Sequence, residues 1–256
     1  MASLQIHMFP CLNDNYGFLI HDPQSGETAS IDTPEAGPIL AAAKAKGWTI
    51  TQIWNTHWHP DHAGGNAAIK AETGCVIYGP KGEAAKIPMI DHAVDDGDQV
   101  RLGQYEARVL NVGGHTMGHI AYHFPSENVA FVGDTLFALG CGRVFEGTPQ
   151  QMWTSLSKLA ALPPETKIYC AHEYTQSNAR FAITIEPDNA ALQARKKSID
   201  AARTKGEPTV PTTIAAELAS NPFLRADTAS VREAVDLKQA PAWQVFAEVR
   251  RRKDTF

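Results

Sequence analysis

The sequence has little cysteine and no long apolar run. Only 4 of the 256 residues are cysteine, and none of them forms a Cys-x-x-Cys pair or a zinc-finger spacing. Scattered thiols are typical of a reducing compartment. No stretch approaches ~18 consecutive apolar residues, and the N-terminus lacks a basic segment followed by an apolar one. We therefore expect no signal peptide, no membrane span or membrane partner, and a cytoplasmic location. The cysteines are Cys11, Cys75, Cys141 and Cys170.

Positive charge is also scarce. The net charge of −5 argues against nucleic acid as a partner. Residues 1–175 contain 10 basic and 18 acidic side chains, a net charge of −8, whereas residues 176–256 contain 13 and 10, a net charge of +3. This asymmetry arises by chance in many proteins, but it also suits bound cations in the first part and a small anion near the second. Nothing in the sequence fixes the oligomeric state, and we take a monomer as the expectation.

Apolar runs and helical segments alternate over the first 175 residues, which predicts a layered α/β domain. The expected strands lie within 4–31, 51–56, 75–80, 99–112, 119–133 and 167–174, and the expected helices cover 37–47, 61–74 and 149–162. The chain beyond Tyr174 has a helical pattern, with helices expected over 188–206, 213–219, 228–237 and 241–253. We therefore place a domain boundary near residue 175, with an α/β domain over 1–175 and a smaller helical domain over 176–256.

The segment His57-Trp58-His59-Pro60-Asp61-His62 contains the pattern H-x-H-x-D-H. His57 and His59 are two residues apart, so in an extended segment both side chains point to the same side and can bind one ion. Asp61 and His62 fall where a helix starts and are available to a second ion. Three histidines and an aspartate within six residues favour metal binding over separate structural roles.

Further ligands are needed, because catalytic zinc-type ions have three or four protein ligands. His115 lies in a glycine-rich turn between predicted strands, Asp134 follows an apolar strand, and His172 stands at the end of another. Each could alone have an ordinary structural role, such as a turn or a cap. Beside the first motif we interpret all three as metal ligands, and His119 as a residue that supports one.

With these motifs the chain resembles the metallo-β-lactamase superfamily and, within it, the glyoxalase II (hydroxyacylglutathione hydrolase) family. The resemblance covers nearly the whole chain. The first metal motif and Asp134 are shared across the superfamily, whereas CGRVFEG, AHEYT and NPFLR are more specific to glyoxalase II. The matching segments are NDNYGFLI (13–20), THWHPDHAGGN (56–66), GGHTMGHI (113–120), FVGDTLFALGCGRVFEGT (131–148), CAHEYT (170–175), NPFLR (221–225) and VRRRKD (249–254).

The resemblance implies a four-layer αββα metallo-β-lactamase-like domain followed by a helical substrate-binding domain. It also implies two divalent metal ions, with zinc expected first and iron or manganese as alternatives. One ion would be held by His57, His59 and His115, and the other by Asp61, His62 and His172, with Asp134 bridging both. Asp61 and Asp134 would also act in catalysis. The glutathione part of the substrate would contact Arg143, Phe145, Tyr174, Arg250 and Lys253. Some members have Lys and Tyr where this chain has Arg143 and Phe145, so one hydroxyl is missing here.

The implied activity is the hydrolysis of S-lactoylglutathione to lactate and glutathione, a step of methylglyoxal detoxification. A hydroxide between the two ions would attack the thioester carbonyl, because metal-bound water has a pKa near ~7. A thiol has a pKa near ~8.5, so the thiolate leaves without a strong general acid.

Other activities remain as alternatives on the same scaffold. A persulfide dioxygenase would use one iron, and the second ligand set here argues against it. A β-lactamase would carry a signal peptide, and a nuclease would present a basic surface. A lactonase would use the same two ions. A non-catalytic metal-binding module would have a closed site, whereas seven ligands for two ions leave room for water.

Overall fold

The computed structural model describes residues 3–256, which form two compact units. The N-terminal unit comprises the described residues up to Asn111 together with Thr116–Gly133, and the C-terminal unit comprises Val112–His115 and Asp134–Phe256. Each unit is a set of residues that pack mainly against one another. The domain boundary expected near residue 175 stays a prediction. Over residues 3–256, every helix is too short or too polar to cross a membrane.

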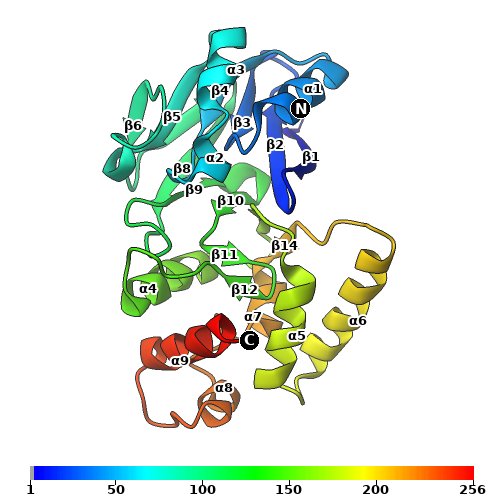
Figure 1. Cartoon of the computed structure of the whole chain (residues 1–256), viewed down its shortest axis with the longest axis vertical. Coiled ribbons are helices and arrows are strands. Elements are labelled where there is room, and N and C mark those ends of the chain that lie inside the picture. Colours follow the sequence, from blue (N-terminus) through cyan, green and yellow to red (C-terminus); the bar gives the residue numbers. More distant parts are fainter. Residues whose placement is uncertain (1–2) are drawn as a thin grey trace. The chain divides into compact units, whose positions relative to one another are not determined.

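The N-terminal unit is built on a sheet in which six strands pair in chain order, β1-β2-β3-β4-β5-β6 (Figure 1). The first three strands are antiparallel, and β3 to β6 are parallel. Central strands such as β2 and β3 are buried on both faces, so they read as continuous apolar runs in the sequence. The strands are β1 (Gln5–Cys11), β2 (Asn15–His21), β3 (Thr28–Ile31), β4 (Ile50–Trp54), β5 (Val76–Pro80) and β6 (His92–Val94).

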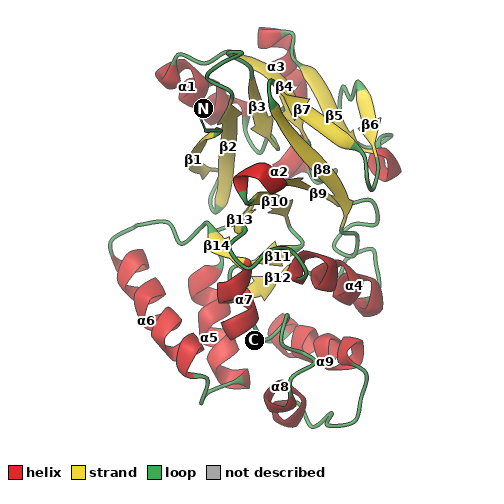
Figure 2. Cartoon of the chain, turned by 180° about the vertical axis from the view of Figure 1, so that it is seen from behind, coloured by secondary structure: helices red, strands yellow, loops and turns green. Residues whose placement is uncertain are grey.

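Strands β7 to β10 of the same unit pair antiparallel in chain order, and Figure 2 shows them from behind. Aromatic side chains fill the space between them and the first sheet. Trp54 stacks on Phe124 with ring centroids 5.8 Å apart, and Phe18 meets Phe131 edge-on at 5.6 Å. The strands are β7 (Gln99–Leu102), β8 (Tyr105–Asn111), β9 (Ile120–Phe124) and β10 (Val129–Gly133), and short 3-10 helices cover Lys81–Glu83 and Pro125–Glu127.

Helices α1 (Ala36–Lys46), α2 (Pro60–Ala63) and α3 (Asn66–Thr73) belong to this unit. Ile39 of α1 and Ile69 of α3 are buried in one apolar cluster with strand residues such as Ile53. The single helix predicted over 61–74 is wrong in one respect, because it is broken into α2 and α3. At the break, the Gly65 N–H donates to the Thr33 carbonyl at 2.8 Å, which only glycine allows, since a Cβ would lie 2.9 Å from that oxygen.

The C-terminal unit contains two short antiparallel strand pairs and a capped helix. Strands β11 (Leu136–Phe137) and β12 (Gly140–Cys141) form one antiparallel pair, and β13 (Lys167–Cys170) and β14 (Thr212–Thr213) form another. Helix α4 (Pro149–Ala160) begins with a capping box, in which Thr148 and Gln151 bond reciprocally.

The remaining helices confirm the helical pattern predicted beyond Tyr174. Helix α5 packs against α6, and α4 packs against α9 (Figure 1). Phe181, Phe223 and Phe246 link several of these helices, with successive ring centroids 5.9 and 6.1 Å apart. The helices are α5 (Thr175–Ile185), α6 (Ala190–Thr204), α7 (Ile214–Ser220), α8 (Ala229–Ala234) and α9 (Ala242–Asp254).

Candidate metal centre

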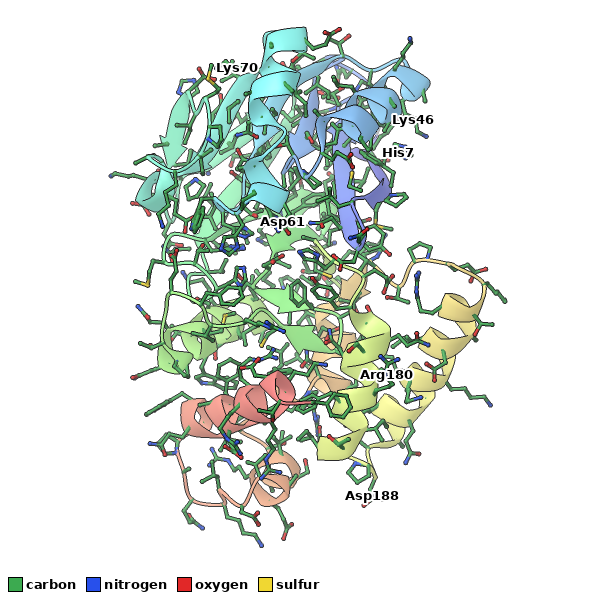
Figure 3. All side chains as sticks on the ribbon, in the orientation of Figure 1. His7, Lys46, Asp61, Lys70, Arg180 and Asp188 are labelled. Atoms are coloured by element: carbon green, nitrogen blue, oxygen red, sulfur yellow. The ribbon has the colours of Figure 1, made fainter. Side chains whose placement is uncertain are left out.

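The N-terminal unit brings together four of the predicted metal ligands at the carboxyl end of β4. His57 and His59 lie in the extended segment after the strand, and Asp61 and His62 lie on α2, where Figure 3 labels Asp61. The His57 Nε2 and His59 Nδ1 atoms are 3.0 Å apart. The His62 Nε2 atom lies 3.6 Å from an Asp61 carboxylate oxygen. Pro60 starts α2 and so turns the chain between the two ligand pairs.

Asp32 orients two of these histidines, although no motif in the sequence singled it out. Its buried carboxylate accepts the His62 Nδ1–H at 2.8 Å and the Thr56 hydroxyl at 2.8 Å. Because the Thr56 hydroxyl proton is used in this way, its oxygen accepts the Nδ1–H of His57 at 3.1 Å. In both rings Nε2 is therefore the nitrogen that carries the lone pair and would bind a metal. The signal in the sequence was an aspartate directly after the apolar strand β3.

The loop between β4 and α2 is held by further buried polar groups. The Glu83 carboxylate accepts the Trp58 N–H at 2.9 Å and the Gly118 N–H at 2.8 Å, so it joins this loop to the one before β9. The His119 ring stacks on His57 with centroids 4.5 Å apart. His119 therefore lies against a predicted ligand, and its supporting role stays a prediction.

The C-terminal unit brings together the other three predicted ligands. Asp134 follows β10, and its two carboxylate oxygens face two different histidines. One oxygen lies 3.4 Å from His115 Nε2, and the other lies 3.3 Å from His172 Nε2. The Nδ1–H of His115 donates to the Arg143 carbonyl at 2.8 Å, so a neutral His115 presents its Nε2 lone pair to Asp134.

This arrangement fits a cation. A lone pair of His115 and a carboxylate oxygen of Asp134 are both acceptors, so their approach to 3.4 Å is unfavourable without a positive charge between them. All three side chains are buried, which strengthens the argument because water screens the repulsion less. Neutral imidazole and carboxylate are ligands that zinc, iron and manganese accept.

Two predicted substrate residues are exposed aromatic side chains next to these ligands. Phe145 is 60% exposed, and its ring lies 5.1 Å from that of His115. Tyr174 is 37% exposed and stacks on His172 with ring centroids 4.7 Å apart. An exposed aromatic pair of this kind offers an apolar surface to a ligand.

The predicted basic substrate residues form a cluster in the same unit. Lys253 donates to the Ser177 hydroxyl at 3.2 Å. Burial, followed by the positive charges of Arg250, Arg180 and Arg143, lowers its pKa. Arg180 lies on α5 (Figure 3), and Arg143 is exposed. Several cations with few acidic neighbours suit an anionic ligand.

Arg250 differs from the others because it is only 8% exposed and is held by the protein itself. It donates to the Cys141 carbonyl at 3.0 Å and to the Asp254 carboxylate at 2.8 Å. Its guanidinium also lies over the Phe223 ring. Arg250 therefore connects α9 to β12, in addition to any contact that it makes with a substrate.

The four cysteines are free and buried. Burial raises the pKa of the Cys11 and Cys141 thiols to about 11 and that of Cys170 to about 12. A nucleophilic cysteine requires a thiolate, so these residues do not supply the nucleophile.

Comparison with known proteins agrees with this geometry. The metallo-beta-lactamase superfamily model matches residues 22–172, and the model described as hydroxyacylglutathione hydrolase C-terminus matches residues 173–256. The structure of ETHE1 from Myxococcus xanthus has 25% sequence identity and a TM-score of 0.67, and covers 99% of each chain. These matches confirm the predicted fold class, the αββα metallo-β-lactamase fold followed by a helical domain. With His and Asp clusters in both units, this fold indicates a binuclear metal site.

Full-length relatives narrow the family. A hydroxyacylglutathione hydrolase of Maricaulis maris is 60% identical over 256 residues, covering 100% of both chains. One of Hyphomonas neptunium is 57% identical over 253 residues, covering 99% of this chain and 98% of its own. Identity at this level over whole chains, together with the ligand geometry, shows that the chain belongs to the hydroxyacylglutathione hydrolase family of the metallo-β-lactamase superfamily.

Proposed function

We propose that this protein hydrolyses S-lactoylglutathione to lactate and glutathione with two zinc ions. The observation that carries the proposal is the position of Asp134, whose two oxygens face two histidines. The same unit also carries the aromatic and basic side chains that suit a glutathione thioester. The names of the full-length relatives support this assignment.

The ligands divide into two sets that share one carboxylate. His57, His59 and His115 would hold one ion, and Asp61, His62 and His172 the other, with Asp134 shared. Support comes from within each unit, because the donor atoms of His57 and His59, of Asp61 and His62, and of Asp134 and the two C-terminal histidines lie close together. Two ions bound in this way would supply a nucleophile at neutral pH and polarise the thioester carbonyl.

The chain's own residues bind and orient the substrate. Arg143 and Lys253 offer cationic groups to the carboxylates of the glutathione peptide, and Arg250 holds Cys141 two residues from Arg143. Phe145 and Tyr174 offer an apolar surface beside the ligands His115 and His172. Asp61 and Asp134 orient the nucleophile toward the carbonyl carbon. The glutathione thiol is a good leaving group near neutral pH, so no further acid is required.

The organisation of the chain follows from this proposal. We infer a catalytic domain over 1–175 and a substrate-binding domain over 176–256, in line with the extents of the two family models. We also infer a cytoplasmic monomer that acts on neither nucleic acid nor membranes. Free cysteines suit a reducing compartment.

The test is hydrolysis of a panel of substrates by metal-analysed protein. S-lactoylglutathione, another acyl-glutathione, a small thioester without the peptide and a lactone would be compared at equal concentration. We expect the glutathione thioesters to react fastest. We also expect about two zinc ions per chain and the loss of activity when a chelator removes them. Faster turnover of the lactone would overturn the thioesterase assignment. One ion per chain under metal-replete conditions would overturn the two-ion assignment.

A further inference from the structure

The hairpin β11–β12 connects two parts of the candidate site. Asp134 lies just before it, and Arg143, whose carbonyl accepts the His115 Nδ1–H, lies just after it. The two ends of the hairpin are close, because the Gly142 N–H donates to the Thr135 carbonyl at 3.2 Å. A Cβ at Gly142 would lie 1.9 Å from the Asp134 carbonyl oxygen. Any shift of the hairpin therefore moves the Asp134 ligand and the partner of His115 together.

The turn of this hairpin is strained. Leu139 has a φ of +58°, a left-handed conformation that is unfavourable for leucine, and its side chain is fully buried. Such a conformation persists only where the surroundings determine it. The hairpin is short, so its own ladder contributes little. Its position must be determined by other groups.

Four side chains fix the position of the hairpin, and we name them the hairpin clamp. They come from α5, from α7 and the residue that follows it, and from α9. Each bonds the backbone of residues 137–141. Asn178 donates to the Ala138 carbonyl at 3.1 Å, Glu217 accepts the Leu139 N–H at 2.8 Å, Asn221 donates to the Gly140 carbonyl at 3.0 Å and to the Phe137 carbonyl at 3.3 Å, and Arg250 donates to the Cys141 carbonyl at 3.0 Å.

Glu217 is at the centre of the clamp. Its carboxylate is fully buried and accepts four hydrogen bonds. One oxygen accepts from the Thr212 hydroxyl at 2.6 Å and from Arg195. The other accepts the Leu139 N–H and the Asn221 amide, the latter at 2.9 Å. A buried carboxylate satisfied in this way holds its donors in one geometry, because moving any of them leaves a charge unpaired.

We propose that Glu217 and Asn221 are positioning residues for the metal centre, through the hairpin that carries Asp134 and the carbonyl partner of His115. The inference rests on the proposed ligand roles of Asp134 and His115. It also gives a function to Asn221 of the NPFLR segment, whose side-chain amide donates to the hairpin carbonyls of Phe137 and Gly140. Groups that orient metal ligands change metal affinity by about 10- to 100-fold when removed.

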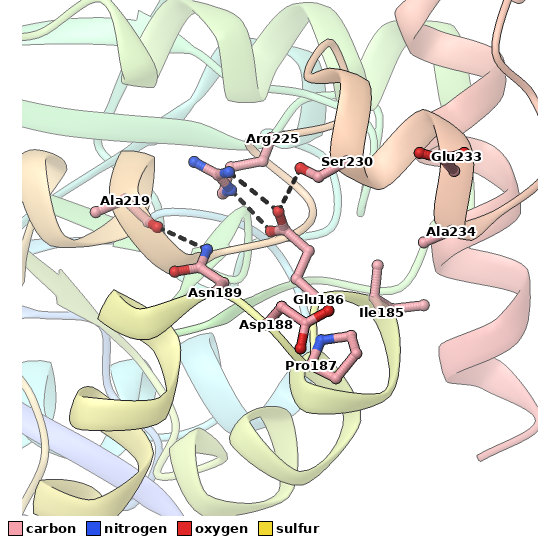
Figure 4. A pocket seen from close by; sticks show the side chains of 10 residues that line it. All are labelled: Ile185, Glu186, Pro187, Asp188, Asn189, Ala219, Arg225, Ser230, Glu233 and Ala234. Carbon is pink, nitrogen blue, oxygen red and sulfur yellow. Dashed lines mark hydrogen bonds and ion pairs between the residues drawn. The ribbon is translucent and has the colours of Figure 1, made fainter.

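The test compares zinc binding and stability in matched variants. Asn221→Ala removes the two hydrogen bonds to the hairpin, and Glu217→Gln removes the central charge. Glu186→Gln is the control, because Glu186 is also a buried carboxylate, and it is paired with Arg225 at 2.7 Å and with Ser230 at 2.7 Å (Figure 4). Zinc affinity would be measured by competition with a chromophoric chelator, and Tm by calorimetry.

We expect Asn221→Ala and Glu217→Gln to weaken zinc binding by about 10- to 100-fold. Glu186→Gln should lower Tm but keep zinc affinity within about twofold of the wild type, since among the described residues neither Arg225 nor Ser230 forms a hydrogen bond with residues 137–141. Should Glu217→Gln fail to fold, Asn221→Ala and the milder Asn178→Ala decide the question. Equal zinc affinity in Asn221→Ala and Glu186→Gln would overturn the proposal.

These outcomes separate this inference from the proposed function. Zinc binding is measured without any thioester, so a wild type that binds zinc but does not hydrolyse S-lactoylglutathione would overturn the function and leave the positioning role standing. If the wild type hydrolyses the thioester but the clamp variants bind zinc as tightly as the wild type does, the positioning role is overturned and the proposed function stands.

Discussion

The two units carry their predicted ligands in different ways. In the N-terminal unit, four ligands come from one six-residue stretch, and carboxylates such as Asp32 and Glu83 hold it from outside. In the C-terminal unit, His115, Asp134 and His172 come from three distant segments, and a backbone carbonyl and a clamped hairpin hold them. A contiguous motif depends on a few strong side-chain contacts, whereas a dispersed one depends on the packing of several helices. Changes in each unit should therefore have different consequences.

The largest effect is expected from Asp134→Ala in the dispersed set. This change removes the carboxylate that faces both His115 and His172. We expect kcat to fall by about 1,000-fold or more, since loss of a single preorganised electrostatic contact already costs about 100- to 1,000-fold. KM should change far less, because the aromatic and basic side chains remain. Steady-state kinetics with S-lactoylglutathione measures both.

Asp188→Ala is a matched control, because Asp188 is an exposed aspartate of the same unit and should leave kcat unchanged. Near-normal turnover in Asp134→Ala would show that Asp134 is not shared between the ions.

A smaller effect, on binding alone, is expected from the basic cluster. Lys253→Ala removes a cation that we assign to a glutathione carboxylate, a contact present before and during reaction. A charge-assisted hydrogen bond contributes about 1.5–3 kcal/mol, so kcat/KM should fall by roughly 10- to 150-fold, through KM. A small thioester without the peptide should react as with the wild type. Equal losses on both substrates would mean that Lys253 supports folding.

Arg250→Ala should show the same rise in KM and, in addition, a lower Tm, because Arg250 also bonds the Cys141 carbonyl. Arg251→Ala is the control on the same helix, since Arg251 is exposed and pairs with Glu248. Its kinetics should match those of the wild type.

For the contiguous ligands, Asp32→Asn should weaken metal binding, because Asp32 orients His62 and Thr56. The amide cannot accept from the Thr56 hydroxyl, the Thr56 N–H and the His62 ring as the carboxylate does. We expect zinc affinity to fall by about 10- to 100-fold, with KM for the thioester nearly unchanged in zinc-saturated protein. Unchanged zinc affinity would show that the short motif holds its geometry without Asp32.

The smallest effect is expected on acid stability, from the ion pairs of Glu248 with Arg251 and Arg252 on α9. Hydrogen bonds from Arg251 and Arg252 lower the pKa of Glu248 from 4.5 to about 2. Its ionised form therefore stabilises the fold above pH 4.5, and this contribution is lost as the pH falls toward 2. Arg251 is largely exposed, so solvent screening limits the contribution to about 1 kcal/mol or less.

Urea unfolding of the wild type and of Glu248→Gln would measure this effect. The difference in their free energies of unfolding should be largest near neutral pH and shrink as the solution becomes more acidic. A difference that stays constant would show that the pair contributes nothing through ionisation.

The metal motif at residues 57–62 could be predicted from the sequence, because its geometry depends on neighbouring residues. The spacing of His57 and His59 on an extended segment places both side chains on one side, and Pro60 begins the turn that separates them from Asp61 and His62. The capping box of α4 and the buried strands were also predictable, because hydrogen bonds and burial of this kind depend on near neighbours in the chain. The break between α2 and α3 was not, since it depends on the distant Thr33 carbonyl.

Only the tertiary structure decided how the ligands are oriented. Nothing in the sequence places Asp32 against His62, the Arg143 carbonyl against His115, or Glu217 against the turn at Leu139. These three pairs of partners are 30, 28 and 78 residues apart in sequence. Residue type and spacing therefore determined which side chains can bind metal. Which nitrogen and which oxygen each presents was decided by long-range packing, because a buried polar group takes the partner that the fold brings to it.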